Sequence, residues 1–247
     1  MEIIEKIKTN KSNENLTEIQ KICLHKLQSS PLPNPKSELW RLSNKSKLSN
    51  FLDYSVNEKD SKFDIPYPKN SQSTIRLIIG ENCEIKLIEK NYSIQQLSED
   101  ELKKYIKEQI SFFNPNENWS DLLNLSLSCK NNILGLKING SKIPPIEIFS
   151  HGSSNSLNAK TLVIFLEKNC DVDLLQVNLG KENSSLSQST FFCLKENSSV
   201  NHGVVSFGES RSNLLNSLNV IQQKNSAYNL GSLHFKFNYA RFEISIK

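Results

Sequence analysis

The sequence is poor in the residues that would mark a metal centre or a disulfide scaffold. Its 247 residues include five cysteines and four histidines, and no CxxC pair occurs. The cysteines are widely scattered, at Cys23, Cys83, Cys129, Cys170 and Cys193. Because their number is odd and their spacing irregular, neither a disulfide framework nor a zinc ribbon is indicated. Cys83 and Cys170 each follow an asparagine at an expected strand corner, and we interpret them as small structural residues.

Long hydrophobic runs are also missing. The first residues, Met1 to Lys6, carry too many charges for a secretory signal. The longest aliphatic run, near Leu162, is far too short to span a bilayer. We therefore expect a reduced, cytoplasmic setting without membrane contact.

The excess of basic over acidic residues is small. Lys and Arg total 30 against 26 acids, and the surplus of four lies within residues 1–50. Nucleic-acid binding would favour runs of basic residues with aromatic side chains between them, and the sequence has none. We therefore expect no nucleic-acid partner.

What the sequence does contain is an internal repeat between Leu162 and Lys236. Three corner asparagines recur every 28 residues, at Asn169, Asn197 and Asn225. Four apolar columns keep this register: Ile164/Phe192/Val220, Val172/Val200/Tyr228, Val177/Val205/Leu233 and Leu179/Phe207/Phe235. One coil cannot hide its apolar face alone, so we expect stacked coils to share a continuous core. The pattern predicts a parallel β-helix of 28-residue coils, with an evenly spaced antiparallel sandwich as the alternative.

The corner residues agree with this prediction. Asparagine tolerates the left-handed backbone conformation and can form ladders of side-chain amides from coil to coil. Gly180 and Gly208 suggest a second shared bend, at which the third copy has Lys236.

The region before the repeat reads as a small helical or α+β unit. Apolar residues recur at helical spacing from Asn15 to Leu27, and a capping box begins a second helix at Ser98. Between these helices Trp40 is expected to be buried, and Arg41 to pair with a carboxylate or cap a helix. Further on we expect a strand, corner and strand at 75–87, a short helix at 121–125 and strands from Ile133. We therefore divide the chain into an N-terminal region, 1–130, and a β-helix, 131–247.

No catalytic constellation emerges from the remaining candidates. The segment from Gly135 to Lys142 resembles a phosphate-binding loop, but Ser and Lys are transposed and strands follow instead of a helix. The histidines are His25, His151, His202 and His234. His202 and Cys193 occupy repeat positions that are apolar in the other copies, so both are expected to be buried in the stack of coils. Asp171 and Asp173 alone do not make a polysaccharide-cleaving site. We assign no catalytic, cofactor-binding or metal-binding residue.

Several short motifs, in order, are similar to those of the SufB/SufD family of iron–sulfur cluster scaffold proteins. They are Leu32-Pro33 with Glu38-Leu39-Trp40-Arg41-Leu42-Ser43, then Leu122 to Ser126, Pro145 to Ile148, Asn225 to Tyr228 and Ala240 to Ile244. In the first motif Ser43 replaces the usual Thr.

The resemblance implies an N-terminal helical region followed by a β-helix. It also implies a complex with a SufB-like scaffold and a SufC-like ATPase, in which the full assembly transiently builds the cluster. The family's functional Cys and His lie in C-terminal segments without a counterpart before Lys247. The resemblance therefore implies a non-enzymatic assembly subunit that binds no cofactor itself. The alternatives are a β-helix enzyme acting on carbohydrate and an unrelated β-helix interaction module.

The repeat also bears on the end of the sequence. Ile246 stands one period after Leu218, at the start of a further strand, so the last coil is expected to be cut open. Phe242, Ile244 and Ile246 would then form an apolar edge, through which the chain is expected to self-associate.

Overall fold

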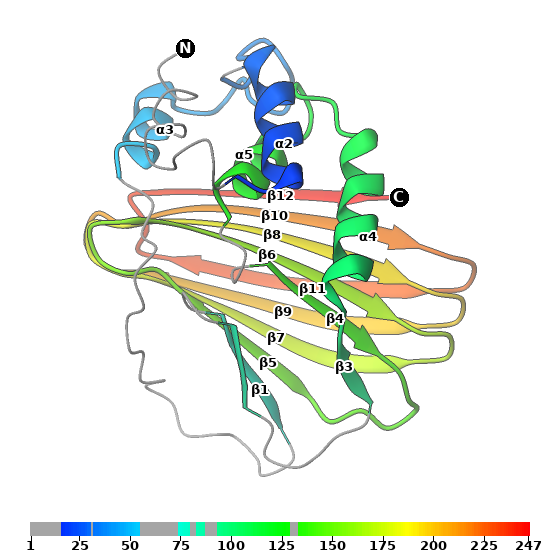
Figure 1. Cartoon of the computed structure of the whole chain (residues 1–247). Helices are drawn as coiled ribbons and strands as arrows, with labels where there is room; N and C mark the ends of the chain where they lie inside the picture. Colours follow the sequence, from blue (N-terminus) through cyan, green and yellow to red (C-terminus); the bar gives the residue numbers. More distant parts are fainter. Residues whose placement is uncertain (1–15, 31, 55–73, 80–82, 87–92, 129–132) are drawn as a thin grey trace.

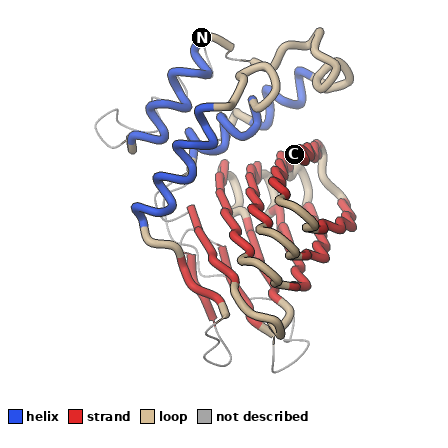
Figure 2. Tube along the Cα trace, turned by 90° about the vertical axis from the view of Figure 1, so that its right-hand side faces the viewer, coloured by secondary structure: helices blue, strands red, loops and turns tan. Residues whose placement is uncertain are grey.

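The computed structural model describes residues 16–30, 32–54, 74–79, 83–86, 93–128 and 133–247. They form a solenoid of two facing sheets, with a layer of helices lying against one of them (Figures 1 and 2). The helix-bearing sheet has the order β12-β10-β8-β6-β4-β3, with β3 at Ile94–Gln96, β4 at Ile133–Ile138, β6 at Leu157–Leu166, β8 at Ser185–Leu194, β10 at Asn213–Gln222 and β12 at Tyr239–Ile246. The opposite sheet has the order β11-β9-β7-β5-β1-β2, with β1 at Ile75–Ile79, β2 at Cys83–Lys86, β5 at Ile146–His151, β7 at Asp171–Gly180, β9 at Ser199–Gly208 and β11 at Ala227–Phe235.

The coils stack in parallel, and up to β11 they keep the predicted register. At the last strand the step is shorter: Leu218 of β10 pairs with Ile244 of β12 and not with Ile246, which ends β12 instead of starting a further strand. Leu166 of β6 pairs with Leu194 of β8, and Val172 of β7 pairs with Val200 of β9. This confirms the parallel β-helix of 28-residue coils and excludes the antiparallel sandwich.

The predicted asparagine corners are present. Asn169, Asn197 and Asn225 have left-handed φ values of 60°, 58° and 57°. Their side-chain amides form the expected ladder, since Asn197 Nδ2 donates to Asn169 Oδ1 at 3.3 Å and Asn225 Nδ2 donates to Asn197 Oδ1 at 3.2 Å. Each corner is thus stabilised both by its backbone preference and by its neighbours.

The predicted second bend is present, but its left-handed residues in the first two copies follow Gly180 and Gly208 by three residues. Left-handed residues close the other side of the coils at Asn155, Asn183 and Arg211, with φ of 57°, 51° and 55°. Gly180 and Gly208 are instead the last residues of β7 and β9, although Lys236 is left-handed at φ 58°. A Cβ on Gly208 would lie 2.4 Å from Ser212 Oγ, so close packing is the reason for glycine there.

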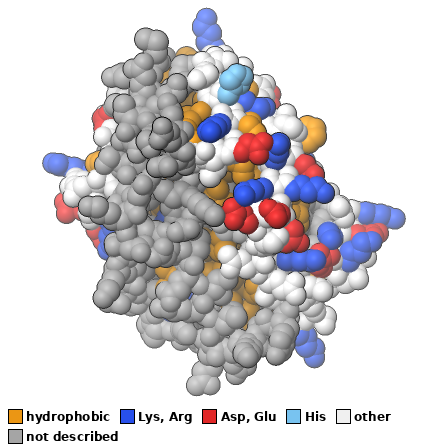
Figure 3. Space-filling model, viewed as in Figure 1, with side chains coloured by type: hydrophobic (Ala, Val, Ile, Leu, Met, Phe, Trp, Pro, Cys, Tyr) orange, Lys and Arg blue, Asp and Glu red, His pale blue; other side chains and the backbone are white. Residues whose placement is uncertain are grey.

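Charged side chains at the corners pair from one coil to the next. Lys168 Nζ lies 3.0 Å from Glu196, and Lys195 Nζ lies 2.7 Å from Glu167. Figure 3 shows basic and acidic side chains beside one another over the right-hand part of this face. These exposed pairs each add little stability, but opposite charges at the period of the repeat favour the correct register.

Only two of the four predicted apolar columns lie inside the solenoid. The columns of Ile164 and Val172 belong to the internal core. The columns of Val177 and Leu179 lie on the outer surface of the opposite sheet, where Leu233 and Phe235 are exposed. The expectation of a single core was wrong for these two columns, because side chains alternate along a strand and the odd-numbered residues of β7 point outwards.

The helical layer forms a second core against the helix-bearing sheet. It comprises α2 at Glu18–Gln28, α3 at Lys45–Phe51, α4 at Glu99–Ser111 and α5 at Trp119–Leu127. The helices predicted at 15–27, from Ser98 and at 121–125 are therefore confirmed, as is the capping box between Ser98 and Glu101. All residues of α5 are buried, since it lies between α2 and strands β6, β8 and β10. No helix in the described ranges has the length and apolar character needed to cross a membrane.

Strands from the N-terminal region extend both sheets. β1 pairs in parallel with β5, and β3 pairs antiparallel with β4. β1 and β2 pair antiparallel, so the strand, corner and strand expected at 75–87 begin as a hairpin and not as a coil. Its corner, residues 80–82, lies outside the described residues. The domain boundary after residue 130 stays a prediction.

Candidate functional site

Arg241 is the centre of a polar cluster on the helix-bearing side. Its guanidinium carbon lies 3.7 Å from the centroid of the Trp40 ring. Nη2 donates to the carbonyl oxygen of Leu39 at 2.6 Å and Nη1 donates to Ser43 Oγ at 2.8 Å. Nε donates to the carboxylate of Glu243. We call these five residues the Arg241 junction.

Trp40 anchors the junction from the helical layer. Its side chain is 2% exposed, which confirms the predicted burial. Its ring meets that of Trp119 at the start of α5 edge to face, with 5.4 Å between centroids. Arg41 is exposed, and the cation over the Trp40 ring comes from Arg241, about 200 residues away in the sequence. A single sequence gives no signal for such a distant pairing.

Asp121 places a buried carboxylate beside the junction, and the sequence analysis did not identify it. It accepts hydrogen bonds from Ser189 Oγ at 2.8 Å, from Ser217 Oγ and from Asn219 Nδ2 at 3.0 Å. Burial raises the pKa of Asp121, while these hydrogen bonds oppose the rise. The only signal in the sequence was an acid in the first turn of an otherwise apolar helix, which could equally mark a helix N-terminus.

An acid-lined pocket of about 460 Å³ opens next to the junction. Its lining includes Glu117, Asp121, Glu243, Arg241 and Lys247. Burial raises the pKa of Glu243, and the nearby guanidinium of Arg241 lowers it. The pocket could hold a small polar ligand. Within the described ranges, no three His, Cys, Asp or Glu side chains are grouped so as to hold a metal ion.

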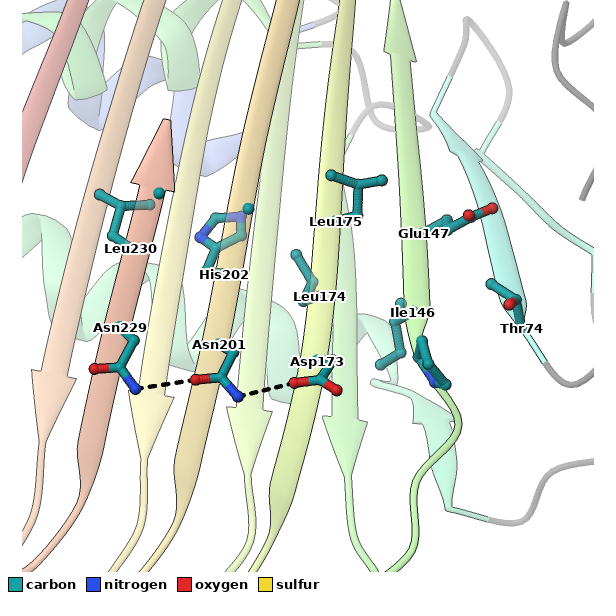
Figure 4. Close-up of a pocket in the computed structure, with 13 residues that line it drawn as sticks. Thr74, Ile146, Glu147, Asp173, Leu174, Leu175, Asn201, His202, Asn229 and Leu230 are labelled. Atoms are coloured by element: carbon teal, nitrogen blue, oxygen red, sulfur yellow. Dashed lines mark hydrogen bonds between the residues drawn. The ribbon is translucent and has the colours of Figure 1, made fainter. Parts of the chain in front are cut away.

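A trough of about 680 Å³ crosses the opposite sheet (Figure 4). Along one side runs a polar ladder, in which Asn229 Nδ2 donates to Asn201 Oδ1 and Asn201 Nδ2 donates to Asp173 Oδ1, both at 2.9 Å. Gly203 and Gly231 leave the trough open. The acids that line it are Asp173 and Glu147, and Glu147 is held by Arg76 at 2.6 Å. The trough therefore does not gather free acids as a polysaccharide-cleaving groove would.

The structure separates the described cysteines. Cys23 lies in the helical core, and burial raises the pKa of its thiol. Cys170 is buried in the solenoid, where Gly140 N donates to its Sγ at 3.3 Å. Cys193 was expected to be buried in the stack of coils, but it lies on the outer face of β8, half-buried beneath α4 with its Sγ 2.9 Å from Tyr105 Oη. The reason is that side chains alternate along β8, and the odd-numbered residues of this strand point out of the solenoid towards the helices. The side chains of Cys83 and Cys129 lie outside the described residues.

The described histidines are also apart. His202 is buried as predicted, against Phe192 and hydrogen-bonded to Tyr228. Burial lowers the pKa of His202 to about 3, and burial with nearby lysines lowers that of His151 to about 3. His25 is exposed and His234 is half-buried at the last coil. None of them forms a pair suited to nucleophilic catalysis within the described part of the chain.

The geometry thus offers a structural junction, an acid-lined pocket and a polar trough. Comparison of the sequence with protein-family models gave no match, and comparison with curated proteins gave none.

Proposed function

We propose that the chain is a non-enzymatic scaffold subunit of a SufBCD-type complex for iron–sulfur cluster assembly, SufD-like within the SufB/SufD family. The observation that carries this proposal is the Arg241 junction. Ser43 and Arg241, which are 198 residues apart, come from the first and last motifs of the resemblance and are hydrogen-bonded. The Leu122 to Ser126 motif lies on α5, whose first residue packs on Trp40.

The contacts at the junction explain why these motifs occur together. Arg241 needs the Trp40 ring as an apolar partner and Glu243 as a counter-charge. α5 needs hydroxyl and amide groups on the sheet to satisfy its buried polar side chains. The first, second and last of the five motifs therefore belong to a single packing unit, which fastens a helical layer to a solenoid. Chance matches would have no reason to meet in space.

A scaffold role also suits the placement of the reactive residues. The described cysteines lie in three separate environments, so the chain offers no shared ligand set for iron from them. We assign cluster ligation to the SufB-like partner and ATP hydrolysis to the SufC-like partner. The cluster is the cargo of the complex, which acts in the cytoplasm.

Affinity purification of the full-length protein from its native cell tests the proposal. We expect a SufB-like scaffold and a SufC-like ATPase to co-purify in comparable molar amounts, measured by quantitative mass spectrometry. An unrelated cytoplasmic protein with the same tag serves as the control. If neither partner is enriched over this control, the proposal is lost.

The acid-lined pocket supports a second candidate, a carbohydrate-active enzyme. Asp121 and Glu243 are two carboxyl groups whose pKa values burial raises, as a general acid requires. This candidate ranks second because Glu243 is paired with Arg241 and Asp121 already accepts three hydrogen bonds. Release of reducing ends from a panel of oligosaccharides by the wild type, and not by Glu243→Gln, would favour it.

A further inference from the structure

The lumen of the solenoid, the space between its two sheets, is apolar in one half and polar in the other. In the helix-bearing sheet one internal column is formed by Lys160, Gln188 and Asn216. In the opposite sheet another is formed by Ser150, Asn178, Ser206 and His234. All of these residues except His234 are buried. The two columns run through successive coils of the solenoid.

At one end Lys160 reaches across the whole lumen. It rises from β6, and its Nζ donates to the carbonyl oxygen of Ile79 on β1 at 2.7 Å and to that of His151 on β5. Both acceptors belong to the opposite sheet. The gap at this layer therefore matches the length of a lysine side chain.

The next two members of the column are too short to do the same. Gln188 and Asn216 are each 1% exposed. Neither Gln188 Oε1 nor Nε2 has a hydrogen-bond partner among the described residues, and the same holds for Asn216 Nδ2. Opposite them, Asn178 Nδ2 donates along its own sheet to Ser206 Oγ at 3.1 Å. Polar groups thus face each other across a gap that their side chains do not close.

The neighbouring layers bound this gap. On one side Thr190 Oγ1 donates to Gln176 Oε1 across the lumen at 3.4 Å. On the other side Leu186 and Leu214 are fully buried. At the last coil the column of Asn216 continues to the apolar Phe242, whose ring meets that of the half-buried His234 edge to face with 5.0 Å between centroids. Neither ring nitrogen of His234 has a hydrogen-bond partner among the described residues.

We propose that the lumen holds a file of buried water molecules between these two polar columns, from Gln188 towards His234. Buried polar groups in folded proteins are almost always hydrogen-bonded, and a buried water makes about three such bonds. Water fits this site because it can both donate and accept hydrogen bonds. The side-chain groups without a partner include donors and acceptors, and they carry no net charge. The file ends at Lys160, whose side chain replaces water as the bridge between the sheets.

A crystal structure of the chain at high resolution tests the proposal directly. We expect ordered water density within hydrogen-bond distance of both Gln188 side-chain atoms and of Asn216 Nδ2. Side-chain collapse that closes the gap, or a dry lumen, would overturn the proposal.

Thermal unfolding of Gln188→Met gives an independent test. Met keeps the length of Gln but removes both polar atoms. If waters are held there, the variant leaves them with fewer partners and Tm falls. If the lumen is dry, the variant removes two unsatisfied groups and Tm rises, which would overturn the proposal. Leu194→Met, on the same strand in the apolar half of the lumen, is the matched control for the effect of a flexible side chain.

Discussion

Removal of the guanidinium of Arg241 tests whether the Arg241 junction holds the helical layer on the solenoid. Arg241→Met keeps most of the apolar length over Trp40 but leaves Glu243, whose side chain is 19% exposed, without its partner. It also removes the hydrogen bonds to the Leu39 carbonyl and the Ser43 hydroxyl. Loss of one partner of a buried ion pair costs about 3–5 kcal/mol. We expect a loss of free energy of unfolding in this range at pH 7.

The loss should depend on pH, because Glu243 can take up a proton when its partner is gone. Protonating a glutamate of unfolded pKa about 4.3 at pH 7 costs about 3.7 kcal/mol, at 1.36 kcal/mol per pH unit. This cost is the upper limit of the electrostatic loss of stability at pH 7, because Glu243 becomes protonated once the loss would exceed it. At pH 5 the limit is about 1 kcal/mol. Burial raises the pKa of Glu243 in the folded state. The folded variant then binds more protons than the unfolded chain, so its stability falls as pH rises above about 4.3.

Equilibrium unfolding in urea at pH 5 and pH 7 measures this difference. The chain has two tryptophans, Trp40 and Trp119, and both lie at the junction, so their fluorescence reports on it. Arg41→Met, an exposed neighbour, is the matched control and should change little. The double variant Arg241→Met/Glu243→Gln should recover most of the loss at pH 7. An equal loss at both pH values would refute the electrostatic reasoning.

Three further predictions concern other parts of the chain. Trp40→Ala should destabilise the helical layer by about 3–5 kcal/mol in urea unfolding, as for other buried tryptophans; an unchanged midpoint would contradict its burial. Ile244 and Ile246, which are half-exposed on the edge strand β12, should drive self-association, so Ile244→Lys should lower the apparent mass in analytical ultracentrifugation, and an unaltered mass would exclude this edge. Anaerobic reconstitution should give no stoichiometric cluster by iron counting, whereas a cluster lost on Cys170→Ser or Cys193→Ser would reverse that expectation.

The features that the sequence predicted are those set by local chemistry and by the period. The 28-residue spacing of Asn169 and Asn197 defines the register directly, because each coil repeats the same backbone path. The capping box at Ser98 predicts the start of α4 for a similarly local reason.

The features that the sequence did not predict depend on which elements pack against each face of a strand. Val177 and Val172 are both apolar, yet one points outwards and the other inwards, and only the packed sheets decide which. The bend at Asn183 was assigned to Gly180 because glycine has two uses, at turns and at close contacts. The Arg241 junction joins residues about 200 positions apart, and composition or periodicity contains no record of such a contact.

The position of α5 across the helix-bearing sheet has a consequence for how the solenoid comes apart. Stacked repeats can unfold one at a time from an end, since each contacts only its neighbours. Here one helix is hydrogen-bonded to several coils at once: Asn124 to the β6 coil, and Asp121 to those of β8 and β10. A coil cannot detach without stripping the helix from the others. α5 therefore joins the coils of β6, β8 and β10 into one cooperative block, which we expect to unfold together.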